Sequence, residues 1–145
     1  DRSFIHGDIK PANLLLNDEG KITLIDFNMT KKRGALRSAF PPQTPIYTAP
    51  EQYEGREDAP ADIYSLGMSM YEIFSGSLPF RITRHTTEQE IKARKRMGPN
   101  QIARENTPMD LSDILMFSLD PDPKRRPTAD VLEDMLGMLQ QDYPL

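Results

Sequence analysis

Four polar side chains that could do chemistry fall within eight residues near the start of the chain. They are His6, Asp8, Lys10 and Asn13, and a second carboxylate, Asp26, follows eighteen residues after Asp8. Two carboxylates, an amide oxygen and a lysine suit a hard, oxygen-binding cation beside a phosphate group, and Mg²⁺ prefers such ligands. The pattern predicts magnesium-assisted phosphate chemistry, although each carboxylate alone is more often a turn or cap residue.

A short β-hairpin is expected to position these side chains. Within residues 13–25, two apolar runs flank a cluster of turn-forming residues, in which Gly20 can adopt a positive φ. A hairpin brings its two ends together. We therefore expect Asp8, Asn13 and Asp26 to converge on one point.

The remaining sequence predicts a long loop followed by helices. Residues 26–50 show neither helical nor strand periodicity, and loops of this length are usually functional or disordered. Residues 62–74 are apolar nearly all round, which is typical of a buried central helix, and Gly76 and Pro79 end it. Three more helices are expected, at 87–97, at 111–119 with Asp110 as N-cap, and at 128–141. The predicted fold class is mainly α with a small β-hairpin.

Composition excludes several classes of protein. The chain has 145 residues and no cysteine, which excludes disulfides, thiolate metal sites and a cysteine nucleophile and fits a cytoplasmic protein. Its net charge of -4 argues against a nucleic-acid binder, although residues 81–104 carry 7 basic and 2 acidic side chains. The apolar stretch 63–74 is too short to span a membrane, which needs roughly twenty residues. The first residue is Asp1 and not Met, so we expect residues upstream.

Five motifs in order make the sequence similar to one family. The chain resembles the C-terminal lobe of a eukaryotic-type Ser/Thr protein kinase over residues 1–145. Three matching segments lie in the first part of the chain: the catalytic loop 6–13 (His-Gly-Asp-Ile-Lys-Pro-Ala-Asn), the magnesium motif 26–28 (Asp-Phe-Asn), and the activation and substrate loop 26–51, which ends in Ala-Pro-Glu. The other two lie in a helical subdomain 62–141: the helix start at 62–67 (Asp-Ile-Tyr-Ser-Leu-Gly) and the arginine motif 122–127.

The resemblance implies roles for individual residues. Asp8 would orient the acceptor hydroxyl and take up its proton, and Lys10 would neutralise charge on the transferred phosphoryl group and favour Ser/Thr acceptors. Asn13 and Asp26 would hold Mg²⁺, while Thr44 would help to shape the acceptor site. ATP and Mg²⁺ are the implied cofactors, and a protein is the implied substrate.

Other matching residues are expected to be structural. The resemblance implies that Glu51 and Arg126 form a buried ion pair, which ties the substrate loop to the last helices. His6 and Asp62 would fix the backbone of the catalytic loop. For His6 a hydrogen-bonded core position is favoured over a role as acid or base.

Three residues depart from the family pattern. Gly7 stands where many kinases have an arginine that clamps a phosphorylated activation loop, so a phosphate on that loop would lack its usual partner. Asn28 replaces a glycine; because asparagine tolerates a positive φ better than most residues, we expect the turn at this position to be kept. Gln43 replaces a glycine that commonly precedes the Thr-Pro pair. None of these changes removes a catalytic group.

Two classes of function stay open. The Gly-rich phosphate loop and the strand lysine of the family are absent from these residues, so an active kinase would need an N-terminal lobe in the same or another chain. The alternative is a pseudokinase, a binding or scaffold module without turnover. The basic stretch 81–96 is either a solvated face or a docking site for an acidic partner. We expect no nucleic-acid partner and no membrane segment.

Overall fold

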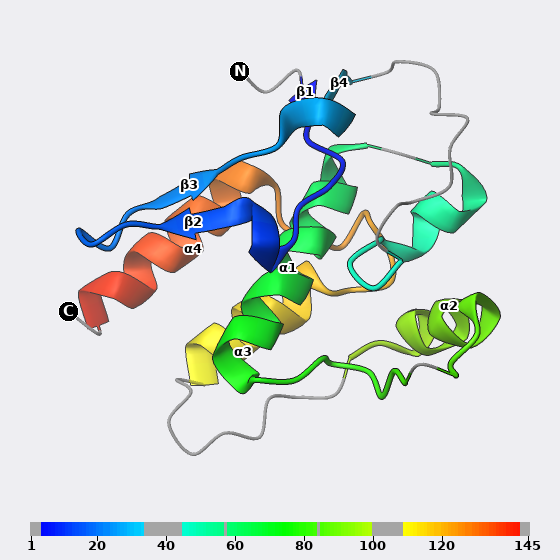
Figure 1. Cartoon of the computed structure of the whole chain (residues 1–145). Helices are drawn as coiled ribbons and strands as arrows, with labels where there is room; N and C mark the ends of the chain where they lie inside the picture. Colours follow the sequence, from blue (N-terminus) through cyan, green and yellow to red (C-terminus); the bar gives the residue numbers. More distant parts are fainter. Residues whose placement is uncertain (1–3, 34–44, 57, 84, 100–108, 143–145) are drawn as a thin grey trace.

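The computed structural model describes residues 4–33, 45–56, 58–83, 85–99 and 109–142. In this part of the chain four helices follow a set of short strands and turns (Figure 1). The helices are α1 (Ala59–Ser75), α2 (Glu88–Met97), α3 (Met109–Ser118) and α4 (Ala129–Asp142). The strands are β1 (Phe4–Ile5), β2 (Leu14–Leu16), β3 (Ile22–Leu24) and β4 (Lys31–Lys32), and the 3-10 turns are η1 (Pro11–Asn13), η2 (Phe27–Met29) and η3 (Pro50–Glu54).

The predicted hairpin is confirmed as the antiparallel pair β2–β3. Leu14 pairs with Leu24, and Leu16 pairs with Ile22. Asn17 holds the connecting turn, because its side-chain oxygen accepts hydrogen bonds from the backbone amides of residues 19 and 21. A second antiparallel pair, β1–β4, was not predicted, since two residues a strand are too few to show periodicity.

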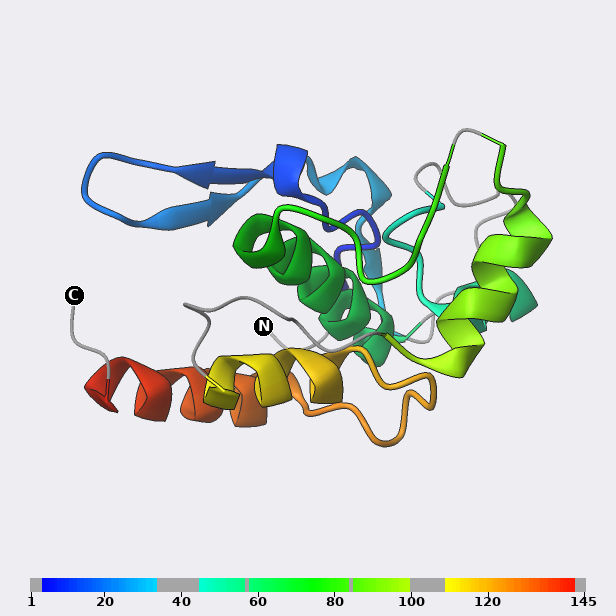
Figure 2. The ribbon, with the colours of Figure 1, turned by 90° about the horizontal axis from the view of Figure 1, so that it is seen from below.

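Helix α1 is the predicted central helix. It begins at Ala59, three residues before the predicted start at Asp62, because Asp58 caps it by accepting the amide of Ala59 at 2.8 Å. Pro60 is tolerated in the first turn, where its missing N–H would have no partner in any case. Figure 2 shows α1 between the hairpin on one side and the layer formed by α3 and α4 on the other.

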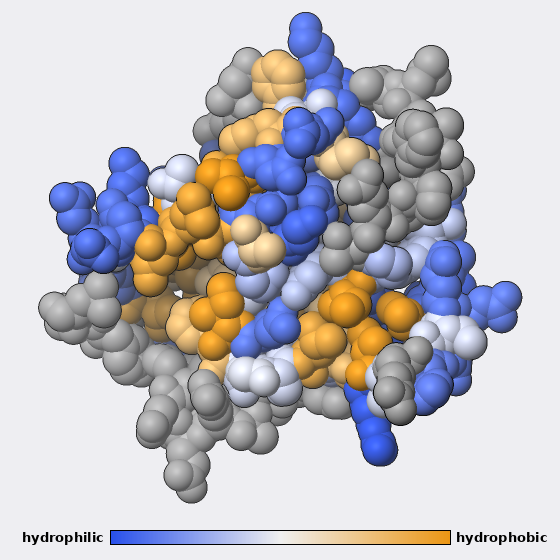
Figure 3. All heavy atoms as spheres, viewed as in Figure 1, coloured by the Kyte–Doolittle hydropathy of each residue, from blue (hydrophilic) through white to orange (hydrophobic). Residues whose placement is uncertain are grey.

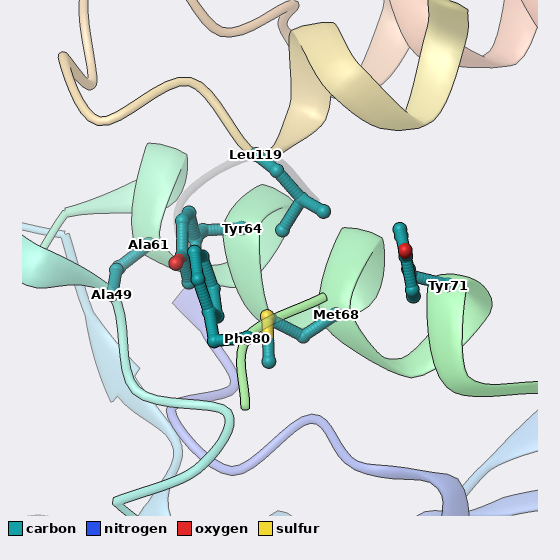
Figure 4. Packing of buried hydrophobic residues seen from close by; sticks show 7 residues of the cluster. All are labelled: Ala49, Ala61, Tyr64, Met68, Tyr71, Phe80 and Leu119. Atoms are coloured by element: carbon teal, nitrogen blue, oxygen red, sulfur yellow. The ribbon is translucent and has the colours of Figure 1, made fainter. Parts of the chain in front are cut away.

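Two clusters of apolar side chains form the core. One gathers on α1 around Tyr64 and Met68, with Phe80 and Leu119 packed against it (Figure 4). The other joins three helices, because Ile63 of α1, Ile114 of α3 and Leu132 of α4 meet there. Burial of such side chains is worth about 1.5–3 kcal/mol each, so α1 supports the rest of the fold through both of its faces.

The bounds of α2, α3 and α4 lie close to the predicted ones, but one predicted N-cap was wrong. Thr87 and Glu90 form a reciprocal capping box at the start of α2. The helix therefore begins at Glu88, one residue after the predicted start. Helix α4 lies within one residue of its predicted bounds. The prediction of Asp110 as an N-cap was wrong: α3 begins at Met109, so Asp110 lies in its first turn, where a carboxylate favours the helix dipole.

Two glycines offer a matched test of the packing between α1 and α3. A Cβ added at Gly67 would lie 2.9 Å from the Cβ of Ser118, whereas one at Gly137 of α4 would meet nothing within 4 Å. We expect Gly67→Ala to lower the free energy of unfolding by about 1–2 kcal/mol through overpacking, and Gly137→Ala to raise it by up to about 1 kcal/mol. Urea midpoints of the two variants measure this, and equal shifts would contradict the close approach.

Candidate active site

The loop before β2 brings three of the expected catalytic side chains into contact. The ammonium of Lys10 donates to Oδ2 of Asp8 at 2.6 Å. The side-chain amide of Asn13 donates to the backbone carbonyl of Asp8 at 2.8 Å and to its Oδ2 at 3.3 Å. A carboxylate, a cation and an amide therefore form one polar cluster within six residues of sequence.

A turn and a buried carboxylate hold this loop in place. The amide of Asn13 donates to the carbonyl of Lys10 at 2.9 Å, which closes the turn η1. Asp62, in the first turn of α1, accepts the amides of His6 at 2.7 Å and Gly7 at 2.9 Å. Burial raises the pKa of the Asp62 carboxyl, and the two amide donors oppose that shift. The backbone before Asp8 is thus anchored to the central helix, as the resemblance implied for Asp62.

His6 is a buried, hydrogen-bonded residue. One ring nitrogen, Nε2, lies 3.1 Å from the carbonyl of Ile25, and the other, Nδ1, accepts the amide of Asp8 at 3.3 Å. The ring also meets Phe27 edge-on, with centroids 5.0 Å apart. Both nitrogens are therefore engaged by backbone groups, which is the structural role expected for His6.

Asp26 lies two residues after the end of β3 and carries the backbone strain of this region. Its φ is +63°, and it is the one non-glycine residue with a positive φ in the described part of the chain. Asn28 does not need the positive φ that asparagine tolerates, because it lies in the 3-10 turn η2, where its amide donates to the carboxylate of Asp26 at 3.4 Å. A left-handed aspartate costs about 1–2 kcal/mol, and such strain clusters at functional sites.

The protein oxygens at this site would bind Mg²⁺ only together with oxygens of a bound phosphate ligand. Among the described residues there is no group of three or more acidic, histidine or cysteine side chains that could hold a metal ion. Asn13 engages Asp8 through its amide nitrogen, which leaves its amide oxygen for a cation, and the exposed carboxylate of Asp26 is the second candidate. Two protein oxygens plus phosphates and waters are the usual set for Mg²⁺ at a nucleotide site.

The hairpin connects these residues. The amide of Ile25 donates to the carbonyl of Asn13 at 3.0 Å, so the residue before Asp26 is bonded to the end of the catalytic loop. The structure thus brings Asp8, Lys10 and Asn13 into direct contact and attaches Asp26 to them through the backbone. Thr44 lies outside the described residues.

The expected ion pair between Glu51 and Arg126 is present and buried. Two guanidinium nitrogens of Arg126 donate to the two carboxylate oxygens of Glu51 at 2.6 and 2.8 Å. The remaining N–H groups reach the carbonyls of residues 60, 120 and 121, and the guanidinium lies 4.8 Å from the ring centroid of Tyr64. The turn η3, the start of α1 and the residues just after α3 are held together at this one side chain.

The interpretation of residues 81–96 as a solvated basic face was incomplete. Lys95 is fully buried, and Arg96 forms an ion pair with Glu54 of η3. Lys92 lies 5.9 Å from the ring centroid of Tyr53. Three of the basic side chains on α2 therefore bind other parts of the same chain. Sequence reasoning missed Lys95 because its partners lie about fifty residues away, and a lysine in a basic helix carries no signal of burial.

Two of the hydroxyls that a kinase could phosphorylate on the activation loop are inaccessible. Thr48 is buried, and the hydroxyl oxygen of Thr30 is buried without a hydrogen-bond partner. Gly7, where many kinases have the arginine that clamps such a phosphate, has a φ of +81° and would bring a Cβ within 3.2 Å of the carbonyl oxygen of Met29. An arginine at this position would be strained, which agrees with its absence.

Comparison with known proteins decides the family. A sequence model described as "Protein kinase domain" matches residues 1–138. The chain belongs to the protein kinase family. A probable serine/threonine-protein kinase of Clostridium perfringens is 31% identical over 142 residues, covering 95% of this chain and 20% of that protein. The tyrosine-protein kinase MasK of Myxococcus xanthus is 32% identical over 146 residues, covering 97% of this chain and 23% of that protein.

The fold comparison agrees with the family. The Cydia pomonella granulovirus kinase PK-1 superimposes with a TM-score of 0.76 at 20% identity, covering 92% of this chain and 49% of that one. The kinase chain described here thus has the protein kinase fold of the predicted lobe, and it spans about a fifth of the length of the two relatives. In its described part, no helix is long and apolar enough to cross a membrane.

Proposed function

We propose that the protein carrying this chain transfers the γ-phosphoryl group of ATP to a serine or threonine hydroxyl of a protein substrate. The contact between Asp8, Lys10 and Asn13 is the observation that carries this proposal. A binding module needs a stable fold but has no physical need for a carboxylate, a cation and an amide at one point of a loop.

Each side chain has a task in the proposed reaction. Asp8 orients the acceptor hydroxyl and takes up its proton as the bond to phosphorus forms. Lys10, now paired with Asp8, supplies positive charge to the transferred phosphoryl group. Asn13 and Asp26 provide oxygen ligands for Mg²⁺, which neutralises phosphate charge when it is bound with ATP. Because the chemistry is mainly positioning and electrostatics, a rigid loop on α1 suffices.

An N-terminal lobe is the proposed partner of the surface formed by the β2–β3 hairpin and the turn η2. Apolar side chains that a lone domain would bury are exposed there: Leu16 by 69%, Ile22 by 61% and Phe27 by 61%. Figure 3 shows hydrophobic side chains gathered over the β2–β3 hairpin on this side of the molecule. Exposed apolar patches of this kind mark interaction sites. A lobe in the same or another chain that supplies the missing phosphate-binding groups would cover it.

The proposal is tested on the full-length protein. We expect the purified protein to incorporate label from γ-labelled ATP into protein acceptors in the presence of Mg²⁺, at a rate on the order of 1–100 s⁻¹ with a good acceptor. Hydrolysis of the product should yield phosphoserine or phosphothreonine. Phosphotyrosine alone would overturn the acceptor class, and nucleotide or partner binding without transfer would favour the scaffold alternative.

A further inference from the structure

Lys95, on the inward face of α2, has an unusual set of partners. Its ammonium donates to three backbone carbonyls, those of Pro45 at 2.7 Å, Ile46 at 2.7 Å and Thr48 at 2.6 Å. Its side chain is fully buried. An ammonium has three N–H groups, so each of them is used by one carbonyl.

The segment 45–48 that receives these hydrogen bonds is held by side chains throughout. Tyr53 also donates its hydroxyl to the carbonyl of Pro45 at 2.8 Å, and Ser65 of α1 donates to the carbonyl of Tyr47 at 2.9 Å. All four consecutive carbonyls therefore accept from side chains, and Lys95 serves three of them. Without a strand or helix to order this segment, its shape depends on those donors.

The charge of Lys95 is balanced by polar and aromatic groups around it. Burial lowers the pKa of Lys95 to about 7, and the carboxylate of Glu51 opposes that shift. The rings of Tyr53 and Tyr64 each lie with their centroids 5.7 Å from the ammonium. The carbonyl oxygens and ring faces both favour the charged form, which alone carries three donors.

Helix α2 has few other attachments to the body of the molecule. Ile91 and Lys95 are its two buried residues. In Figures 1 and 2 the segment that begins at Pro45 lies between α1 and α2, and α2 stands apart from the layer of α3 and α4. Arg96 and Lys92 attach α2 to Glu54 and Tyr53 of η3, whereas Lys95 attaches it to the segment that leads into η3.

We propose that Lys95 is a positioning residue for the protein acceptor. Its ammonium fixes segment 45–48 in the shape that receives the protein substrate. The affinity for that substrate therefore depends on how α2 packs against this segment. This inference rests on the proposed kinase function. The hydrogen-bond partners of Lys95 lie in segment 45–48 and not in the polar cluster at Asp8, so its effect should fall on the acceptor and not on ATP.

The test compares Lys95→Met with Lys124→Met in the full-length protein. Methionine keeps the length and burial of the side chain but removes the three donors, whereas Lys124 is an exposed lysine outside α2. We expect Lys95→Met to raise the KM for the protein acceptor about tenfold or more, with the KM for ATP and kcat within about threefold of wild type. Amide hydrogen exchange should accelerate at residues 46–49 but not in α3 or α4. Lys124→Met should change neither.

Lys95→Arg provides a second variant that keeps a positive charge. A flat guanidinium cannot direct three N–H groups at oxygens that converge on one point, so the same changes are expected with smaller size. An unchanged acceptor KM with unchanged exchange would overturn the proposal. So would exchange that accelerates throughout the protein, unfolding of both variants, or an equal rise in acceptor KM for Lys92→Met, which would make α2 a charged docking surface. If the wild type transfers no phosphate, the proposed function fails, while the exchange data still decide whether Lys95 orders the loop.

Discussion

Replacing Asp8 with asparagine is expected to lower the kcat of the full-length protein by about 10²–10⁴-fold, with little change in the KM for ATP. The amide is nearly the same size and can keep the contacts with Lys10 and Asn13, but it cannot accept a proton from the acceptor hydroxyl. The loss would therefore come from chemistry and not from a misplaced loop. Initial rates over a range of acceptor and ATP concentrations separate kcat from the two KM values.

Asp26→Asn should also abolish turnover, for a different reason. Of the two candidate ligands of Mg²⁺, Asp26 alone is charged, and the substitution removes that charge, so we expect no recovery across a Mg²⁺ titration. Asp18→Asn is the matched control, because Asp18 is an exposed carboxylate on the hairpin turn. If both site variants keep wild-type kcat while the protein binds no Mg²⁺, the kinase proposal is wrong and the scaffold alternative replaces it.

The polar cluster was predictable because its members are neighbours in sequence. Asp8, Lys10 and Asn13 lie within six residues, and the turn η1 that folds them together begins at a proline. The conformation of the residue at position 28 was not predictable in the same way. The substitution of asparagine for glycine suggested a sharp bend there, but the positive φ occurs two residues earlier, at Asp26, because the 3-10 turn begins directly after it.

The helices were predictable where one apolar face repeats, as in α1 and α4, and their exact ends were not. The start of α1 is set by the N-cap at Asp58, and the periodicity of apolar residues does not show where that cap lies. Lys95 shows the limit more clearly. The pattern of charges along α2 favours a solvated face, and only the fold brings three carbonyls from about fifty residues away to its ammonium. Long-range polar contacts of this kind leave no local signal.

Arg126→Ala is expected to lower the free energy of unfolding by about 3–5 kcal/mol. The side chain of Arg126 is fully buried, and that of Glu51 is 6% exposed. Removing the guanidinium leaves the buried carboxylate without its hydrogen-bonded cation, and it leaves the carbonyls of residues 60, 120 and 121 without this donor. Arg125→Ala removes the same charge from the adjacent exposed position, so it should cost well under 1 kcal/mol.

A double-mutant cycle identifies the origin of that loss. If the cost comes mainly from a stranded carboxylate, Glu51→Ala combined with Arg126→Ala should be less destabilising than the sum of the two single variants, because neither charge then remains buried alone. Urea unfolding followed by far-UV circular dichroism measures all four proteins. Strict additivity would show that the two side chains act independently, and equal losses for Arg126→Ala and Arg125→Ala would contradict a buried pair. The expected coupling would show that Glu51, at the end of the substrate loop, is held in place by the helical part of the chain.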